Sequence, residues 1–475
     1  MKKVKVVGLI IQLLCLSITL SYSQEYEISP ELDLRNDFSY YVVPIDKEVC
    51  VIRNKAVRIL LQKLDADQTW TIEKELNLEG KKWNILDVYR HHDMFGILYL
   101  CKVDKNIRCY YSVFDVNGNK KFQRRIIDST EILSMENVSF QFSEDKKFCT
   151  VGIRDMQNKP WVVLYNRLQD SIYYTIKANE VYDIRNGLAE EAFLSNSGEF
   201  YLMAVEENSY KSETKNIPRI IGANASGKKF LDQQIITDEE IVSAKLSYHN
   251  STNELIFVGL CNEKESQKIS SYILKNLTKD AEVKTYTFEE KYITEWSGKR
   301  NSSVINGYNL KLRDVKFLFD GSCMLFMENV KQYVRRPYFG AGIENNGAFT
   351  NNRWIDYYYD DILVSCINSN GEKKWETILH KKQFSQDDEG INSSFFIVTN
   401  KSFLRIIFND EIKNETTVSE YILLADGETN RKSILNTSNN KLHLRIKDAS
   451  QVDANSIIVP SENAGRLSIM HLVLN

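Results

Sequence analysis

Apolar and polar positions alternate in short runs along most of this chain, and a sustained 3.6-residue apolar period is nearly absent after the first 23 residues. Runs of about five to nine β-branched and aromatic residues, such as 95–103, 107–116 and 362–367, are typical of strands. Asn-Gly and Asp-Gly pairs between the runs supply the residues that tight hairpin turns require. The pattern therefore predicts an all-β protein.

One hairpin recurs along the chain. Val113–Ile126 reads VFDVNGNKKFQRRI and Cys366–Leu379 reads CINSNGEKKWETIL, and each joins two strands through an Asn-Gly turn, a double Lys and an aromatic residue. Residues 221–235 repeat the scheme with a shorter turn. The comparable turns, most of them 51 to 58 residues apart, fall near Ala66, Gly118, Gln169, Gly227, Lys279, Gly371 and Gly427.

A repeating unit of about fifty residues with four strands is the signature of a β-propeller blade. After the seventh hairpin, residues 441–475 hold three more strand candidates, and residues 25–34 supply an extended piece ahead of the first unit. We therefore predict a β-propeller of eight four-stranded antiparallel blades whose ring is closed by an N-terminal strand. Seven blades is the close alternative, and an array of two-sheet sandwiches would leave the regular spacing unexplained.

These hairpins resemble those of WD40-like and quinoprotein-like β-propellers. The chain also resembles exported propeller proteins of Gram-negative bacteria, most of all in DDILVSCINSNGEKKWETIL at 360–379. The Gly-His and Trp-Asp pairs of true WD40 repeats and the Ser-x-Asp-x-Gly-x-Thr-Trp boxes of sialidases are absent from the sequence. The resemblance therefore implies a fold and assigns no role to any residue.

The first residues read as an export signal. Lys2, Lys3 and Lys5 precede an apolar run at 6–20, and small residues follow it at Ser21 and Ser23. This order predicts a signal peptide over 1–23 that is cleaved near Ser23, with an uncleaved anchor as the alternative. We accordingly expect a single propeller domain over 24–475, exported to the periplasm or secreted, without a transmembrane segment.

Composition narrows the possible partners. The 475 residues include 61 basic and 64 acidic side chains, and removal of the three signal-peptide Lys leaves 58 against 64, a net charge of −6. The basic residues are scattered, which argues against nucleic-acid binding. With 43% hydrophobic and 11% aromatic residues, the chain is globular and not disordered. Neither a cofactor nor a metal is predicted.

Seven Cys follow the signal, without the spacing of a metal site. Cys101 and Cys109 lie symmetrically about Lys105, so a hairpin loop of Asp104, Lys105 and Asn106 would place them opposite each other and allow a disulfide. Otherwise each Cys sits in an apolar stretch, where a free thiol behaves as a small buried hydrophobe.

Two long connections are the candidate binding segments, because long loops are uncommon unless they are functional. The first, 289–309, joins the fifth and sixth units, and the second, 330–359, is an aromatic-rich insertion between the second and third strands of the sixth unit. The resemblance to propellers implies that both lie on one face. The candidate binding residues are Trp296, Arg300, Tyr333, Arg335, Arg336, Tyr338, Phe339, Arg353, Trp354, Tyr357, Tyr358 and Tyr359.

Arg together with Tyr and Trp is the composition of recognition hot spots. We therefore predict a non-enzymatic scaffold that binds a protein or glycan in the cell envelope or outside the cell. Alternatively, these aromatic residues form a small core that holds the insertion against its own blade. The other alternative is a carbohydrate-active enzyme with carboxylates, such as Asp360-Asp361 or 387–389, at the central channel, although charged turns beside strands are the commoner explanation of such clusters.

Overall fold

The computed structural model describes residues 25–104, 106–129, 138–154, 160–177, 187–206, 217–262, 269–279, 281–289, 309–335, 354–410, 417–437 and 442–474. Within these residues the protein is all-β, with a single-turn 3-10 helix at Ile446–Asp448. No helix in this part of the chain has the length and apolar character needed to cross a membrane.

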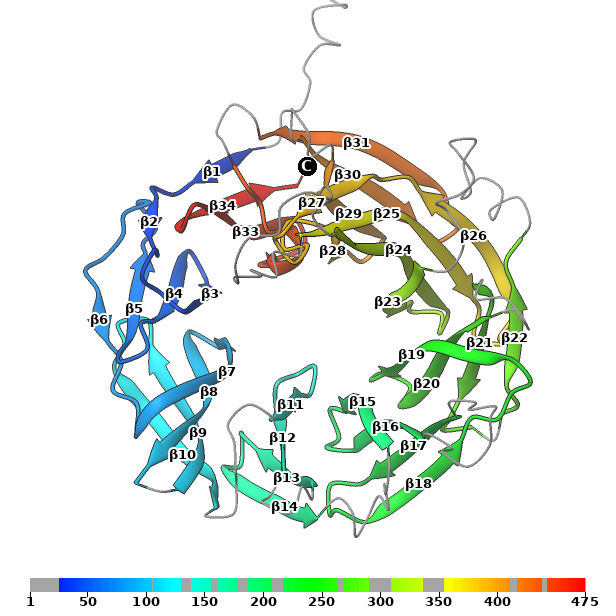
Figure 1. The fold of residues 1–475 in the computed structure, drawn as a ribbon, viewed down its shortest axis with the longest axis horizontal. Coiled ribbons are helices and arrows are strands. Elements are labelled where there is room, and N and C mark those ends of the chain that lie inside the picture. Colours follow the sequence, from blue (N-terminus) through cyan, green and yellow to red (C-terminus); the bar gives the residue numbers. More distant parts are fainter. Residues whose placement is uncertain are drawn as a thin grey trace, which may run out of the picture. The chain divides into compact units, whose positions relative to one another are not determined.

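Contacts divide the chain into two compact units. The larger comprises 36–390 and 425–428, and the smaller comprises 1–35, 391–424 and 429–475. The larger unit holds six antiparallel sheets, each formed by strands consecutive in the chain (Figure 1).

The strands of the first three sheets are β3 (Ser39–Ile45), β4 (Glu48–Asn54), β5 (Ile59–Leu64) and β6 (Lys74–Glu75); β7 (Lys81–His91), β8 (Met94–Val103), β9 (Asn106–Asp115) and β10 (Lys120–Ser129); and β11 (Ser139–Phe142), β12 (Phe148–Arg154), β13 (Pro160–Asn166) and β14 (Ser171–Lys177). Those of the fourth and fifth are β15 (Gly187–Leu194), β16 (Phe200–Glu206), β17 (Ile217–Ala223) and β18 (Lys229–Gln234); and β19 (Glu240–His249), β20 (Glu254–Asn262), β21 (Ile269–Asn276) and β22 (Lys284–Thr287). The sixth holds β23 (Leu310–Phe317), β24 (Cys323–Arg335), β25 (Trp354–Ile367) and β26 (Lys373–Leu379), with β27 (Gln383–Gln386) also on β25.

The smaller unit holds the last two sheets. The seventh has β28 (Phe395–Thr399), β29 (Phe403–Asp410), β30 (Thr417–Leu424) and β31 (Thr429–Asn436), and the eighth has β32 (Ser450–Gln451), β33 (Ser456–Asn463), β34 (Arg466–Val473) and β1 (Tyr26–Ile28), with β2 (Leu32–Asp33) also on β34. The protein is thus an eight-bladed β-propeller, as the hairpin spacing predicts.

The hydrophobic cores lie between consecutive sheets. In the larger unit, one core joins the first and second sheets, another the second and third, and so on to the fifth and sixth. In the smaller unit a single core joins the seventh and eighth sheets. Side chains of a strand point alternately to the two faces of its sheet. A sheet that is covered on both faces therefore needs middle strands that are apolar throughout, such as β8 and β20, which are buried along most of their length.

The recurrent turns join the third and fourth strands of each of the first seven sheets. Gly118 and Gly371 occupy equivalent positions with φ of 72° and 71°, a conformation that glycine adopts without steric cost. Their backbone N–H groups donate to the carbonyl oxygens of Asp115 and Asn368, at 2.8 and 2.9 Å. All seven turns predicted from the sequence fall at this place in the first seven sheets.

The N-terminal strand completes the eighth sheet, as predicted. Strand β1 pairs antiparallel with β34, with Tyr26 opposite Leu472. Ser29 adds two hydrogen bonds, because its N–H donates to the Ile469 carbonyl and its Oγ accepts from the Ile469 N–H, both at 2.9 Å. The strand thereby covers the edge of β34 that would otherwise be open.

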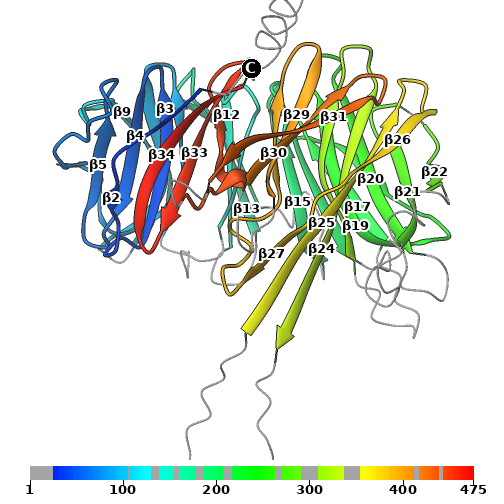
Figure 2. The ribbon, with the colours of Figure 1, turned by 90° about the horizontal axis from the view of Figure 1, so that it is seen from above.

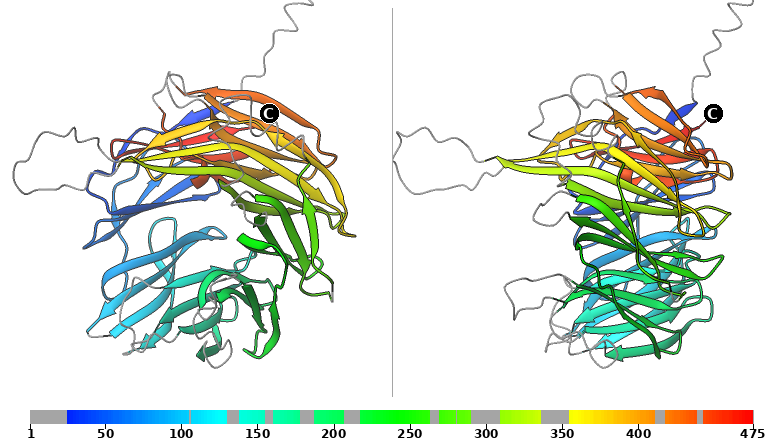
Figure 3. Two further views of the ribbon diagram at one scale, coloured as in Figure 1. Left: turned by 45° about the vertical axis from the view of Figure 1, so that its right-hand side comes forward. Right: turned by 90° about the vertical axis from the view of Figure 1, so that its right-hand side faces the viewer.

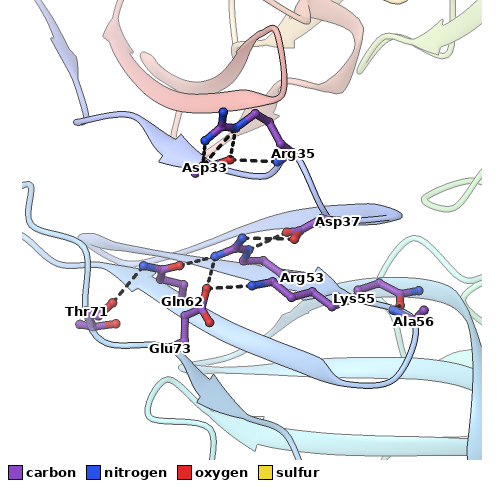
Figure 4. A network of polar contacts seen from close by, with 10 residues as sticks. Asp33, Arg35, Asp37, Arg53, Lys55, Ala56, Gln62, Thr71 and Glu73 are labelled. Carbon is purple, nitrogen blue, oxygen red and sulfur yellow. Dashed lines mark hydrogen bonds and ion pairs between the residues drawn. The ribbon is translucent and has the colours of Figure 1, made fainter.

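A buried arginine of the first sheet, Arg53, links polar side chains from several of its segments (Figure 4). Arg53 on β4 is 3% exposed and donates from Nε to Asp37 at 2.6 Å and from Nη1 to Gln62 on β5 at 2.7 Å. Glu73 receives a further bond from Arg53 and one from Lys55. Arg53 Nη2 also donates to Asp37, at 3.2 Å. Four contacts to one planar cation thus fix the segment that enters the sheet at Asp37.

The expected pairing of Cys101 with Cys109 is wrong. Strands β8 and β9 pair Val103 with Asn106, so Cys101 lies opposite Arg108 and Cys109 opposite Leu100. This register differs by one residue from the one assumed for a three-residue loop, and a shift of one residue turns a side chain to the other face of the sheet. Cys101 packs in the core between the first and second sheets, Cys109 packs in the core between the second and third, and both thiols are free.

We predict that replacing Leu32 by Ala lowers the free energy of unfolding by about 2–5 kcal/mol, because this buried side chain holds the N-terminal segment on β34. Urea unfolding followed by tryptophan fluorescence measures the change. The control is Phe38→Ala, since Phe38 is 78% exposed and its removal should change stability by less than about 0.5 kcal/mol. Equal effects of the two substitutions would contradict a role for the N-terminal segment in the eighth sheet.

A second prediction concerns the seven described cysteines, all of which are buried. Burial raises the pKa of Cys50 and Cys323 to about 12 and that of Cys101 and Cys366 to about 11. Because the thiolate is the reactive form, these thiols should remain unmodified by iodoacetamide at pH 8 in the folded protein and react fully in denaturant. Intact mass spectrometry counts the adducts, and rapid labelling of Cys101 before unfolding would contradict the prediction.

Candidate functional site

The two described ends of the predicted insertion, 330–335 and 354–359, continue two strands. Strand β23 pairs with β24 only as far as Asn329, but β24 continues to Arg335 and pairs with β25 from Val330↔Tyr359 to Arg335↔Trp354. Strand β27 pairs with the same stretch of β25. We call these three pieces, Val330–Arg335, Trp354–Tyr359 and Gln383–Gln386, the ribbon. Figures 2 and 3 show β24 and β25 running past the ends of the neighbouring strands of the larger unit.

One face of the ribbon has its own small core. Tyr357 and Tyr359 are 6% and 7% exposed and cluster with Val330 and Ile355. A Cβ atom at Gly390 would lie 2.7 Å from the Tyr359 ring, so the absence of a side chain there lets the following turn close over that ring. These two tyrosines therefore hold the ribbon to its own blade, which is the structural alternative raised by the sequence.

The opposite face carries a row of aromatic rings. The rings of Tyr333 on β24 and Tyr358 on β25 meet edge to face with centroids 5.7 Å apart, and Tyr358 contacts Phe384 on β27 at 5.0 Å. Arg335 forms an ion pair across the strands with the buried carboxylate of Asp356. The outer end of this row is accessible, since Tyr333 is 46% exposed and its neighbour Val334 is 54% exposed on the other face.

A fully buried lysine anchors the base of the ribbon. The Lys381 ammonium lies 2.7 Å from the buried Glu328 carboxylate on β24. It also donates to the Tyr359 carbonyl on β25 at 3.0 Å and to the Gln383 side chain on β27 at 2.9 Å. One ammonium group thus links all three strands. Arg313 on β23 adds a second cation, 3.1 Å from the same carboxylate.

The irregular pairing beside this anchor brings more charges together. Asn329 alone faces two residues of β25, Asp360 and Asp361, which forms a β-bulge. Burial lowers the pKa of Lys381, although Glu328 opposes the shift, and burial raises the pKa of Asp360. Lys331 is also buried, and its pKa is lowered for the same reason. Burial therefore disfavours the charged forms of Lys381, Asp360 and Lys331.

Several of the carboxylates proposed for catalysis accept hydrogen bonds from backbone N–H groups. Asp361 accepts the Lys381 backbone N–H at 3.0 Å, and Asp387 accepts the Ile355 N–H at 2.7 Å. Asp388 accepts the Gly390 N–H at 2.8 Å. Carboxylates in this arrangement shape a bulge and a turn. Within the described ranges, no group of three or more His, Cys, Asp or Glu side chains could hold a metal ion.

The structure brings together five of the predicted binding residues, Tyr333, Arg335, Tyr357, Tyr358 and Tyr359, and places the backbone of Trp354 at the end of β25. Trp296, Arg300, Arg336, Tyr338, Phe339 and Arg353 lie outside the described residues. Sequence reasoning missed Phe384, Lys381 and Glu328. The only sequence signal for β27 is the alternation of polar and apolar residues in Gln383-Phe384-Ser385. The whole strand has four residues, which are too few to distinguish a strand from a loop.

No protein-family model matches the sequence, and no curated protein is significantly similar to it. Several solved structures are similar in fold at low identity. An uncharacterised protein from Listeria monocytogenes is 10% identical, with 80% of this chain and 91% of that chain covered and a TM-score of 0.39. The WD40 domain of coronin from Toxoplasma gondii is 9% identical, with 95% and 87% covered and a TM-score of 0.39. TolB from Acinetobacter baumannii is 12% identical, with 80% and 78% covered and a TM-score of 0.29. The function must be argued from this chain's own residues.

We predict that Lys381→Met lowers the free energy of unfolding by about 3 kcal/mol, because the substitution leaves the buried Glu328 without its closest cation. Urea unfolding measures the loss, and hydrogen exchange at Gln383–Gln386 should quicken as β27 loses its anchor. The control is Arg466→Met, since Arg466 pairs with Glu31 at the surface and such pairs contribute about 1 kcal/mol or less. If both variants lose the same stability, Lys381 does not anchor the ribbon.

Proposed function

We propose that this protein is a non-enzymatic, exported binding scaffold of one propeller domain that recognises a partner protein through the ribbon. The observation that carries the proposal is an ordered three-stranded extension whose outer end exposes Tyr333, Val334 and Arg335. Exposed aromatic, aliphatic and arginine side chains on one element are the composition of interface hot spots.

The internal core of the ribbon supports this assignment. Tyr357, Tyr359 and Val330 are buried against each other, and Lys381 links the three strands. Tyr333 and Val334 lie further out, and about half of each side chain is exposed. A recognition surface on rigid strands loses little conformational entropy on binding. The exposed pair is therefore better explained by contact with a partner than by folding.

The open edge of β24 favours a protein over a glycan. From Val330 to Arg335, this strand pairs with β25 on one side, and on its other side no strand of the described part of the chain pairs with it. Such an edge offers backbone N–H and C=O groups to an incoming strand. A polypeptide can pair with these groups in register, whereas a glycan cannot extend the sheet.

The test is affinity capture from envelope extract with the full chain, compared with a Tyr333→Ser/Val334→Ser variant. We expect recovery of at least one partner to fall more than tenfold in the variant, because both substitutions remove exposed contact area and leave the buried side chains of Val330, Tyr357 and Tyr359 in place. The matched control is Ile72→Ser/Phe319→Ser, which removes two hydrophobic side chains that are 93% and 95% exposed elsewhere.

Two results would contradict the proposal. Equal recovery by the ribbon variant and the intact protein would exclude these side chains from recognition. Capture that survives digestion of the extract by protease and is abolished by glycosidase would identify a glycan ligand instead of a protein. Circular dichroism and thermal unfolding of each variant ensure that a loss of capture is not a loss of fold.

A further inference from the structure

A second candidate site lies between the second and third sheets, apart from the ribbon. Arg167, in the turn between β13 and β14, lies over two tyrosine rings, with its guanidinium carbon 4.7 Å from the Tyr89 centroid and 5.6 Å from that of Tyr111. The two rings are nearly parallel, with centroids 5.9 Å apart. The backbone N–H of Arg167 donates to the Lys147 carbonyl at 2.9 Å, which holds the turn in place.

This cluster has more hydrogen-bond donors than acceptors. Arg167 Nη2 donates to His91 Nδ1 at 3.0 Å, but its Nε and Nη1 are closed to solvent and have no hydrogen-bond partner. The hydroxyls of Tyr89 and Tyr111 are also buried; they interact with each other, and beyond that contact neither has a hydrogen-bond partner. The three unpaired guanidinium hydrogens lie in the plane of the group, so stacking on the ring faces cannot satisfy them.

Protonation gives this cluster of donors a net positive charge. Arginine keeps its charge in proteins, and among the described residues no carboxylate forms an ion pair with Arg167. Burial raises the pKa of Tyr89 and Tyr111, so both hydroxyls keep their protons, and the contact between them uses only one of these protons. Burial and the neighbouring Arg167 lower the pKa of His91, which therefore accepts through Nδ1 as a neutral ring.

A glycine keeps the two hydroxyl ends together. Gly96 on β8 lies beneath the rings, and a Cβ atom there would come within 2.9 Å of Tyr89 Cζ and 3.0 Å of the Tyr111 hydroxyl. Any other residue at this position would push the rings apart. The strand thus leaves room for both hydroxyls beside a half-buried cation, and closed donors such as Arg167 Nε and Nη1 are costly unless an acceptor completes them.

We infer that Arg167, Tyr89 and Tyr111 form a binding site for a small monovalent anion, a halide or a short carboxylate. A negative charge would neutralise the guanidinium, whose Nε and Nη1 are closed to solvent, and its lone pairs would accept from these nitrogens and from a tyrosine hydroxyl. The anion must be small, because neighbouring side chains have to move to admit it beside atoms that are closed to solvent. The site would stabilise the packing of the second sheet on the third.

The test is the melting temperature of the full-length protein while sodium chloride or sodium acetate replaces sodium gluconate at constant ionic strength. A ligand that binds only the folded state raises this temperature along a saturating curve. We expect such a curve for the wild type with at least one anion, and at least a tenfold higher half-saturating concentration for Arg167→Gln. The anion with the lower half-saturating concentration identifies the ligand as a halide or a carboxylate.

The double variant Tyr89→Phe/Tyr111→Phe removes only the two hydroxyls and keeps the ring stack, so it decides the question if Arg167→Gln does not fold. Its half-saturating concentration should also rise at least tenfold. The control is Arg466→Gln, whose side chain is half-exposed on the eighth sheet and should respond like the wild type. Equal saturating responses in all four proteins, a linear response in the wild type, or electron density for water alone beside Arg167 would overturn the inference.

Discussion

Apolar packing between consecutive sheets is the constraint on which the rest of this structure depends. Strand β8 illustrates it, since Phe95, Ile97 and Tyr99 pack toward the first sheet while Leu98 and Leu100 pack toward the third. A sheet with two apolar faces is not stable alone and requires a neighbour on each side. The near-continuous apolar strands, the all-β fold and the regular spacing of the turns all follow from this requirement.

The ribbon extends beyond this packing between consecutive sheets. Beyond Asn329 the strands have lost their partner β23, so they must be stabilised by contacts of their own. A third strand, a small tyrosine core and a buried ammonium group supply these contacts. Structure maintained at such cost outside the shared cores is a sign of function, because an ordinary turn would join β24 to β25 more simply.

The fold was accessible from the sequence because its signals are local. Glycines such as Gly118 and Gly371 mark tight turns by their conformation, and their spacing reveals the repeat. The candidate site was accessible only in part. Its aromatic residues identified the segment, but in the sequence Lys381 stands in a polar His-Lys-Lys run that suggests exposure. Its burial depends on contacts with β24, β25 and β27, and no local pattern reveals these contacts. The cysteine pairing failed for a similar reason, since one residue of register separates the two faces of a sheet.

The eighth sheet, unlike the other seven, can be completed only after the last strand of the chain has been synthesised. The other seven sheets are each built from a continuous stretch of chain, so each can assemble as soon as that stretch has been made. The bond from Ser29 to Ile469 joins residues 440 positions apart, and β1 must wait for the last strand before it can pair. Contacts this distant in sequence form slowly. Until the last strand has been made, the start of the chain carries a strand without its pairing partner, and unpaired strands favour aggregation.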